Sequence, residues 1–295
     1  MPVDKNYVNT RPVAIMINNI EQAQPLLGIS QADIMYECMV EGAITRIMAV
    51  FKNPYDIEMI GSVRSARPYF INIARGLDAI YVHVGGSTQA LSMLESGFID
   101  SFNLGNYTEM MWRDPQRRAT LGYEHSAVTS GKRLLDGIKN SSYKSEHKST
   151  YKYGQEFSEN SQVLNGENCR NLKAEFSWYK NTVFDYNENE KTYYVSQFGE
   201  SQLDGNSNVQ NSKQNVLALY INTYSMEDSV LQEMDLIGTG EGYYMSRGKI
   251  IPIKWTKKSY DSPFVYKTLS GEDLRMLPGQ CYVCCVPLSG NISYN

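Results

Sequence analysis

The chain has 295 residues and a formal net charge of -4, and 42% of its residues are apolar and 20% charged. This composition excludes a mostly disordered chain and predicts a globular protein. The length suggests two domains, and one large domain is the alternative. It gives no support for nucleic-acid binding, because a general nucleic-acid binder needs an excess of Lys and Arg to neutralise phosphates. No apolar run approaches the length of a membrane span, and no signal peptide is visible.

Residues 1–145 alternate strand and helix signals. Apolar runs that end at turn residues predict strands over Val13–Asn18, Ile44–Phe51 and Ala79–Val84. Helical patterns with start or stop signals predict helices over Tyr69–Arg75, Thr88–Glu95 and Gly131–Lys139. We therefore expect an N-terminal α/β domain over residues 1–145.

The pattern changes after residue 145. Residues 146–168 are rich in Ser, Lys, Glu and Asn, which predicts a linker or irregular excursion in which His147 is solvated. Residues 169–295 are typical of a mainly antiparallel β domain, with predicted hairpins over 182–197 and 243–255. Gly238–Gly242 is expected to be a loop. Tyr243, Tyr244 and Trp255 form either core or a sugar- or peptide-binding surface, and core is favoured.

The two halves differ in their basic residues. Residues 1–140 contain 9 Arg and 4 Lys, and residues 141–295 contain 3 Arg and 12 Lys. Because Arg presents a rigid planar fork of donors, the first half is the expected place for recognition of carboxylate or phosphate. The alternative is that these arginines form structural ion pairs.

The segment Gly61–Pro68 is the sharpest local feature. A strand is expected to end near Ile60, and a helix capped by Ser65 is expected to follow. Arg64 and Arg67 would then lie beside the free N–H groups of a helix N-terminus, an arrangement that suits an anion. The alternative is internal neutralisation by an acid, and the available acids are Glu37, Glu41, Asp114 and Glu124.

Two histidines in the first half are candidate general bases. His83 lies near Ser87, and His125 is followed by Ser126, but no spacing shows that base and hydroxyl meet. A structural role for each histidine is the competing interpretation. No two-His or His-Cys pair has ligand spacing, so neither a metal site nor a cofactor is expected.

Three of the five cysteines lie together near the C-terminus. Cys281 and Cys284 have C-x-x-C spacing without a second pair. The surrounding run indicates a strand with Cys281 and Cys285 on one face and Cys284 on the other. We expect buried thiols, with no zinc and no disulfide among these three.

Several stretches in this order resemble the YerB-like lipoproteins, a bacterial family with a two-part domain of unknown function (DUF3048). In the first half the resemblance rests on 11–19, 32–37, 40–46, 61–68, 79–87, Arg113-Asp114 and 124–126. In the second half it rests on looser motifs at 184–186, Tyr194, Asp204, 215–216, 238–242, 254–257 and 277–280.

The resemblance implies an α/β (α+β) fold, layered as two sheet layers and a helix layer. It also implies an extracytoplasmic lipoprotein, anchored to the membrane by a lipidated N-terminal cysteine that is absent from this sequence. It supplies no reaction. We therefore expect a protein that binds a small anionic molecule or peptide (a carboxylate, a phosphate or an acidic peptide) in an arginine-lined cleft. The alternative is a cell-envelope hydrolase that uses His83 or His125 with a neighbouring carboxylate or serine. The candidate binding residues are Glu37, Glu41, Arg46, Arg64, Ser65, Arg67, His83, Ser87, Arg113, Asp114 and His125.

Overall fold

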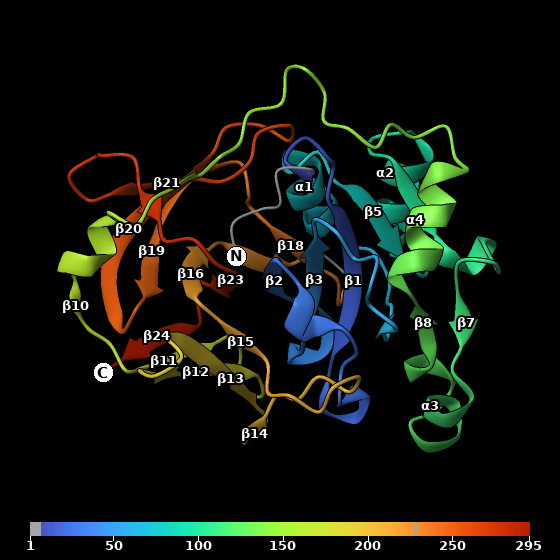
Figure 1. The fold of residues 1–295 in the computed structure, drawn as a ribbon, viewed down its shortest axis with the longest axis horizontal. Helices are drawn as coiled ribbons and strands as arrows, with labels where there is room; N and C mark the ends of the chain where they lie inside the picture. The colour runs from blue at the N-terminus through green and yellow to red at the C-terminus, as the bar shows by residue number, and fades with distance from the viewer. Residues whose placement is uncertain (1–6, 227–228) are drawn as a thin grey trace.

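The computed structural model describes residues 7–226 and 229–295, and an 11-stranded mixed sheet runs through its centre (Figure 1). Its order is β10-β20-β19-β16-β23-β2-β3-β1-β5-β6, and β21 pairs with β20. The strands are β1 (Val13–Asn19), β2 (Ile34–Met39), β3 (Thr45–Phe51), β5 (Ile80–His83), β6 (Ser101–Asn103), β10 (Glu167–Asn168), β16 (Asn215–Ile221), β19 (Gly238–Ser246), β20 (Lys249–Lys257), β21 (Val265–Thr268) and β23 (Cys281–Pro287).

Each half of the chain contributes one continuous block to this sheet. The blocks meet where β2 pairs with β23 in parallel, with Glu37 opposite Cys284. Within the first block, β1 is antiparallel to β3 and parallel to β5, and β5 is parallel to β6. The expected domain boundaries at 145 and 168 stay a prediction. Between them lie two short strands and a turn of 3-10 helix, η7 (Gln162–Asn165).

A second, six-stranded sheet is entirely antiparallel. Its order is β14-β13-β12-β11-β24, and β15 pairs with β13. Its strands are β11 (Asn171–Glu175), β12 (Asn181–Asn187), β13 (Thr192–Gln197), β14 (Glu200–Ser201), β15 (Ser212–Lys213) and β24 (Asn291–Tyr294). The smaller sheets contain β4 (Ile60–Gly61), β7 (Trp112–Arg113), β8 (Ala127–Thr129), β9 (Glu156–Phe157), β17 (Thr223–Ser225), β18 (Gln232–Met234) and β22 (Arg275–Met276).

The helices are short. They are α1 (Pro68–Gly76), α2 (Thr88–Glu95), α3 (Pro115–Thr120) and α4 (Gly131–Lys139), with further 3-10 turns at η2 (Glu21–Ala23), η3 (Ile29–Gln31), η4 (Glu41–Ala43), η5 (Leu104–Asn106) and η6 (Tyr123–His125). No helix in the described ranges is long and apolar enough to cross a membrane.

Two hydrophobic cores cover the two faces of the large sheet. Alternation along β1 places Ile15 in one core and Met16 in the other. The first core lies against the six-stranded sheet, and the second lies against α1 and α2 (Figure 1). The expected layering of two sheets and a helix layer, with a mainly antiparallel C-terminal part, is confirmed.

Two local expectations are wrong. Helix α1 begins at Pro68 with Arg67 at the N-cap position, so Ser65 does not cap it. Gly238–Gly242 is not a loop but the first half of β19. A Cβ on Gly240 would lie 2.6 Å from the Trp255 ring on the paired strand, so this glycine permits close strand packing.

Aromatic and sulfur side chains of the second half are mostly core. Tyr244 and Trp255 are buried, as favoured from the sequence, and Tyr243 is half-buried. All five cysteines are buried. The expected alternation along β23 is confirmed, because Cys281 and Cys285 lie in the helix-side core and Cys284 lies in the sheet-side core.

Candidate functional site

Three arginines and one glutamate gather at one end of the large sheet. We call Arg46, Arg64, Arg67 and Glu41 the arginine cluster. Arg46 lies opposite Asn18 in the β1–β3 ladder, where β1 ends, and the parallel strand β5 ends beside it. Ligands of open α/β sheets bind outside the carboxyl ends of such parallel strands, so the location suits a binding site.

Glu41 holds the guanidinium of Arg67 in a bidentate ion pair. Arg67 Nε donates to Glu41 Oε1 at 2.5 Å, and Arg67 Nη2 donates to Oε2 at 2.8 Å. Burial alone would raise the pKa of Glu41, but the bonds and charge of Arg67 leave that pKa below its usual 4.5. Arg67 Nη1 donates to the carbonyl of Ala66 at 2.7 Å. Arg67 is therefore fully engaged inside the protein.

Arg46 and Arg64 are less completely neutralised. Arg46 Nη1 donates to the carbonyl of Ser65 at 3.0 Å, and its Nη2 lies 3.9 Å from Glu41 Oε2. Burial first, and then the charge of Arg67, lower the pKa of Arg46 to about 10. Among the described residues, the Arg64 side chain bonds only to Glu124, through the carbonyl at 3.1 Å and the 73%-exposed carboxylate at 3.4 Å. Excess positive charge thus remains at Arg64.

His125 borders the cluster but does not meet a serine hydroxyl. Its Nδ1 lies 2.9 Å from the amide nitrogen of Asn18, so the amide donates and the imidazole proton resides on Nε2. Burial and the charge of Arg64 lower the pKa of His125 below 6.5. The Ser126 hydroxyl donates instead to the carbonyl of Tyr123 at 2.7 Å.

His83 and Ser87 lie next to the cluster in structural roles. The buried imidazole of His83 donates from Nδ1 to the carbonyl of Gly85 at 2.7 Å, and burial lowers its pKa. Ser87 is the N-cap of α2, because its hydroxyl accepts from the N–H of Ala90. The turn between β5 and α2, which contains Gly85, is joined to the cluster by the N–H of Ala66, which donates to the Gly85 carbonyl at 2.9 Å.

Arg113 and Asp114 border the same region. Arg113 donates to the carbonyl of Tyr123 at 2.9 Å, and its guanidinium stacks over the Tyr123 ring at 4.0 Å. Asp114 caps α3 by accepting from Arg117 N–H at 2.7 Å. Asp114 was one of the acids expected to neutralise Arg64 or Arg67, but its carboxylate caps a helix instead.

Glu37 lies away from the arginines, on the opposite face of the sheet. It is 0% exposed, and its carboxylate lies 3.6 Å from the equally buried Lys180 of the second half. It accepts four hydrogen bonds of 2.6–2.9 Å, from Asn19, Thr45, Thr182 and Tyr282. Glu37 therefore joins the two halves and is not part of the arginine cluster.

Arg46, Arg64 and Arg67 line neither of two hollows on the described surface. One of about 530 Å³ is lined by residues that include Phe102, Tyr107 and Arg133. The other, of about 420 Å³, is lined by residues that include Asp235 and Trp255. Neither of these hollows is the arginine-lined cleft expected from the sequence.

Comparisons with known proteins identify the family. The N-terminal domain described as "Protein of unknown function (DUF3048)" matches residues 1–144, and the corresponding C-terminal domain matches residues 172–283. The chain belongs to the DUF3048 family. The protein named "Putative lipoprotein YerB" from Bacillus subtilis (strain 168) is 28% identical over 97% of this chain and 84% of its own length. The crystal structure of YerB from Bacillus subtilis superposes with a TM-score of 0.86 at 26% identity, over 99% of this chain and 97% of that chain.

Sequence reasoning missed several polar residues around the DUF3048 arginine cluster. Asn18 and Asn103 stand at the carboxyl ends of β1 and β6, and Asn103 accepts from Gly85 N–H at 3.2 Å. The buried Tyr81 hydroxyl has no hydrogen-bond partner in the described part of the chain. A search for polar residues at predicted strand ends would have found Asn18, but not Asn103, because no strand is predicted from the sequence at Ser101–Asn103. No group of described His, Cys, Asp and Glu residues is arranged to hold a metal ion.

Proposed function

We propose that this DUF3048 protein is an extracytoplasmic lipoprotein whose arginine cluster binds an anionic ligand: a carboxylate, a phosphate or an acidic peptide. Its similarity to a bacterial protein named as a lipoprotein supports the anchoring and location. The charge balance of the cluster supports the binding. The guanidiniums of Arg46 and Arg67 share the partly buried carboxylate of Glu41. Among the described residues, Arg64 pairs only with Glu124, whose carboxylate is mostly exposed.

Within this proposal the arginines have different roles. Arg67 is engaged by Glu41 and by a carbonyl, so it positions Glu41 and with it η4. Arg64 is the arginine that contacts the ligand, because its carboxylate partner, Glu124, is mostly exposed and lies at a long 3.4 Å. The Arg64 side chain is 22% exposed, and its two terminal nitrogens each make one contact to Glu124, so each keeps a second N–H for the anion.

Calorimetric titration of the wild type with phosphate, acetate and an acidic peptide tests the proposal. A charge-assisted hydrogen bond contributes about 1.5–3 kcal/mol, so Arg64→Ala is expected to weaken binding about 10- to 150-fold with little change in melting temperature. Arg170→Ala, which removes a 78%-exposed arginine from the second half, is the matched control and should bind as the wild type does. Absence of binding by the wild type to all three anions, or equal loss in both variants, contradicts the proposal.

Arg67→Ala separates binding from structure. It leaves Glu41 without its bidentate partner, so it is expected to lower the free energy of unfolding by about 2–4 kcal/mol. The hydrolase alternative would need a histidine bonded to a serine hydroxyl or a carboxylate. In the described part of the chain, His83 bonds to the carbonyl of Gly85 and His125 bonds to the amide of Asn18.

A further inference from the structure

We propose that the opposite end of the large sheet is a membrane-facing surface that binds the headgroups of anionic phospholipids. We define this basic face by Lys52, Lys144, Lys148, Lys152 and Tyr153. The proposal rests on the lipoprotein assignment above. It adds the orientation of the molecule on the membrane and the residues that produce that orientation.

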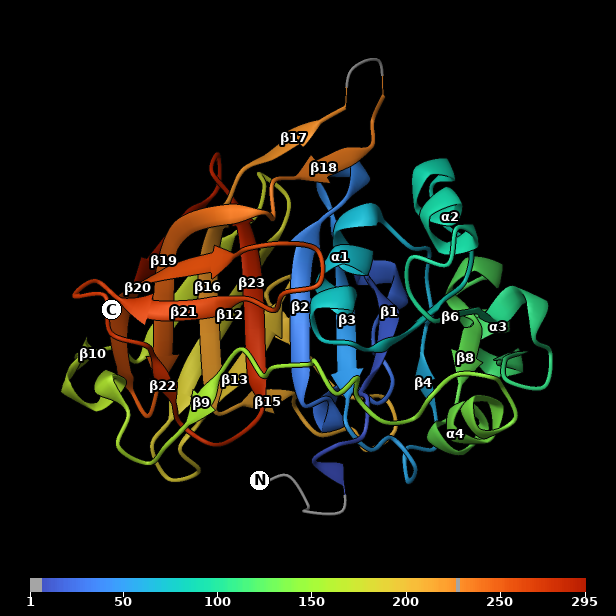
Figure 2. The same cartoon turned by 90° about the horizontal axis from the view of Figure 1, so that it is seen from above.

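The first described residues of the chain are fixed on this face. Arg11 N–H donates to the carbonyl of Ser145 at 2.8 Å, and His147 N–H donates to the carbonyl of Asn9 at 2.9 Å. The Tyr153 hydroxyl donates to the carbonyl of Val8. Figure 2 shows this N-terminal end on the side opposite the β17–β18 hairpin. A lipid attached upstream of residue 7 would therefore draw this face toward the bilayer.

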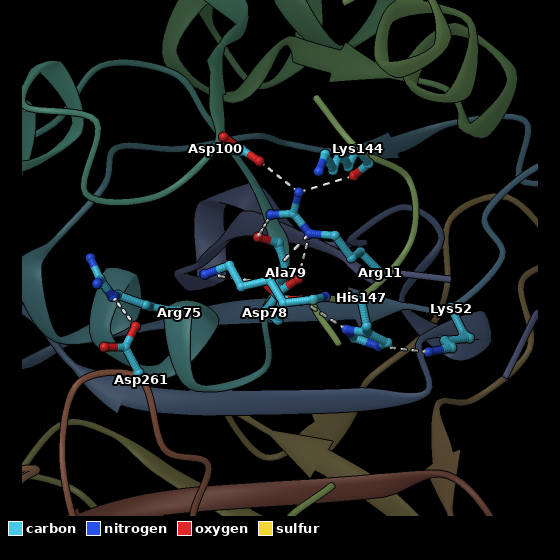
Figure 3. A network of polar contacts seen from close by, with 10 residues as sticks. Arg11, Lys52, Arg75, Asp78, Ala79, Asp100, Lys144, His147 and Asp261 are labelled. Atoms are coloured by element: carbon cyan, nitrogen blue, oxygen red, sulfur yellow. Dashed lines mark hydrogen bonds and ion pairs between the residues drawn. The ribbon is translucent and has the colours of Figure 1, made fainter. Parts of the chain in front are cut away.

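A buried polar network holds the face in place, and within it the carboxylates of Asp78 and Asp100 are paired with His147 and Arg11 (Figure 3). His147 Nδ1 lies 3.1 Å from Asp78 Oδ2, and its Nε2 lies 3.2 Å from Lys52 Nζ. A neutral imidazole here donates to Asp78 and accepts from Lys52. Arg11 donates to the Asp78 carbonyl at 2.8 Å and to the Asp100 carboxylate at 2.6 Å. His147, expected from the sequence to be solvated, is instead almost completely buried in this network.

The charge left over at the surface is positive. Lys144, Lys148 and Lys152 are exposed, and Glu146 is the single acid among residues 144–153. The Lys148 ammonium lies 3.6 Å from Asp78, so the left-over charge is carried mainly by Lys144 and Lys152. Tyr153 is 57% exposed beside them. Lysines attract anionic headgroups, and tyrosine rings concentrate at the interface between lipid and water. This combination matches an anionic bilayer rather than an acidic protein groove, because the surface lies beside the end of the chain that would carry the lipid anchor.

The orientation places the arginine cluster away from the membrane. The basic face lies where β1 begins, and the cluster lies where β1 ends. Seven residues of strand separate these ends by about 20 Å at roughly 3.3 Å per residue. A protein docked through the basic face presents the arginine cluster outward, to ligands outside the membrane surface.

Co-sedimentation with vesicles tests this proposal. The 295-residue chain is mixed with vesicles of phosphatidylcholine alone, or of phosphatidylcholine with about one third phosphatidylglycerol. The test variant Lys144→Gln/Lys152→Gln removes two exposed charges from the basic face. The matched control, Lys191→Gln/Lys254→Gln, removes two exposed lysines from the β12–β13 turn and from β20.

Each lysine near an anionic surface changes partitioning by about fivefold, so the test variant is expected to bind about 25-fold more weakly. The control should stay within about twofold of the wild type, and salt should weaken wild-type binding. Equal loss in test and control variants overturns the proposal. So does binding that is independent of phosphatidylglycerol, or no binding at low salt. Titration of the test variant with anions, which should match the wild type, keeps this result separate from the arginine-cluster proposal.

Discussion

Exchanging Glu37 for Gln is expected to destabilise the protein strongly, because it leaves the buried ammonium of Lys180 without an anionic partner. Lys180 is 0% exposed, its Nζ has no hydrogen-bond partner in the described part of the chain, and Glu37 lies 3.6 Å away. Burial lowers the pKa of Lys180 from 10.5 to about 8, despite the opposing attraction of Glu37. Glu37→Gln keeps the shape and part of the hydrogen bonding but removes that attraction.

The magnitude follows from the burial of both charges. Removing one partner of a buried ion pair costs about 3–5 kcal/mol, and we expect this loss for Glu37→Gln. Lys180→Met removes the buried cation, while Glu37 keeps its four hydrogen-bond donors. We therefore expect the free energy of unfolding to change by no more than about 2 kcal/mol. The double variant should then be more stable than Glu37→Gln alone by about 2 kcal/mol or more.

Urea unfolding of the four proteins measures this cycle. The control is the same cycle on Lys267 and Asp273, whose 2.7 Å pair is 46% and 73% exposed and should couple by less than about 1 kcal/mol. Because the folded pKa of Lys180 lies below its unfolded value, its penalty is present below pH 8 and is relieved between about pH 8 and 10.5. As the pH rises across that window, the free energy of unfolding of the wild type should therefore increase by about 3 kcal/mol relative to that of Lys180→Met. Additive single changes, together with parallel pH profiles, would refute the reasoning.

Two further predictions concern packing and capping. Gly240→Ala places a Cβ 2.6 Å from the buried Trp255 ring, so we expect the free energy of unfolding to fall by about 1–3 kcal/mol and the tryptophan fluorescence maximum to shift. The control is Gly105→Ala, whose nearest contact is 3.4 Å and which should lose less than half as much free energy of unfolding. Ser87→Ala removes the N-cap of α2 and should lower the free energy of unfolding by about 1 kcal/mol, whereas Ser87→Asp should retain most of it; a thermal scan in which both variants melt alike would show that the cap contributes nothing.

Elements with local signals could be predicted from the sequence. Helix α2 has the predicted bounds Thr88–Glu95, and the β12–β13 hairpin follows its alternation. Strand β2 could not be predicted in the same way, since a charged Glu37 interrupts its apolar run. The residues that satisfy this charge, Thr182 and Tyr282, lie 145 and 245 positions away along the chain. Only the folded structure brings these groups together.

The candidate site was predicted as a set of residues but not as a geometry. The motif 61–68 did lead to Arg64 and Arg67, and Glu41 was among the acids considered. The sequence could not assign Glu41 to Arg67, because η4 and the start of α1 meet only in the folded chain. It could not place Glu37 on the opposite face, because that depends on strand register. One position along β2 changes the face on which a side chain lies. The roles of Ser87 and Asp114 as helix caps follow from local spacing and were within reach of sequence reasoning.

The seam between the two blocks of the large sheet bears on whether each half can fold alone. Residues 1–144, which match the N-terminal family domain, include β2 but not its partner β23. Expressed alone, they would expose the edge of β2 and leave Glu37 without Lys180, Thr182 and Tyr282.

We therefore expect residues 1–144 alone to aggregate or to lack a cooperative unfolding transition. Mixing with residues 145–295 should restore one, because the two pieces together complete the sheet and the Glu37 network. Circular dichroism during urea unfolding, with sedimentation velocity on the same samples, measures both properties. A monomeric fragment 1–144 that unfolds cooperatively would show that the first half is an independent domain. The Glu37–Lys180 pair would then be a contact between two preformed units rather than a condition for forming either.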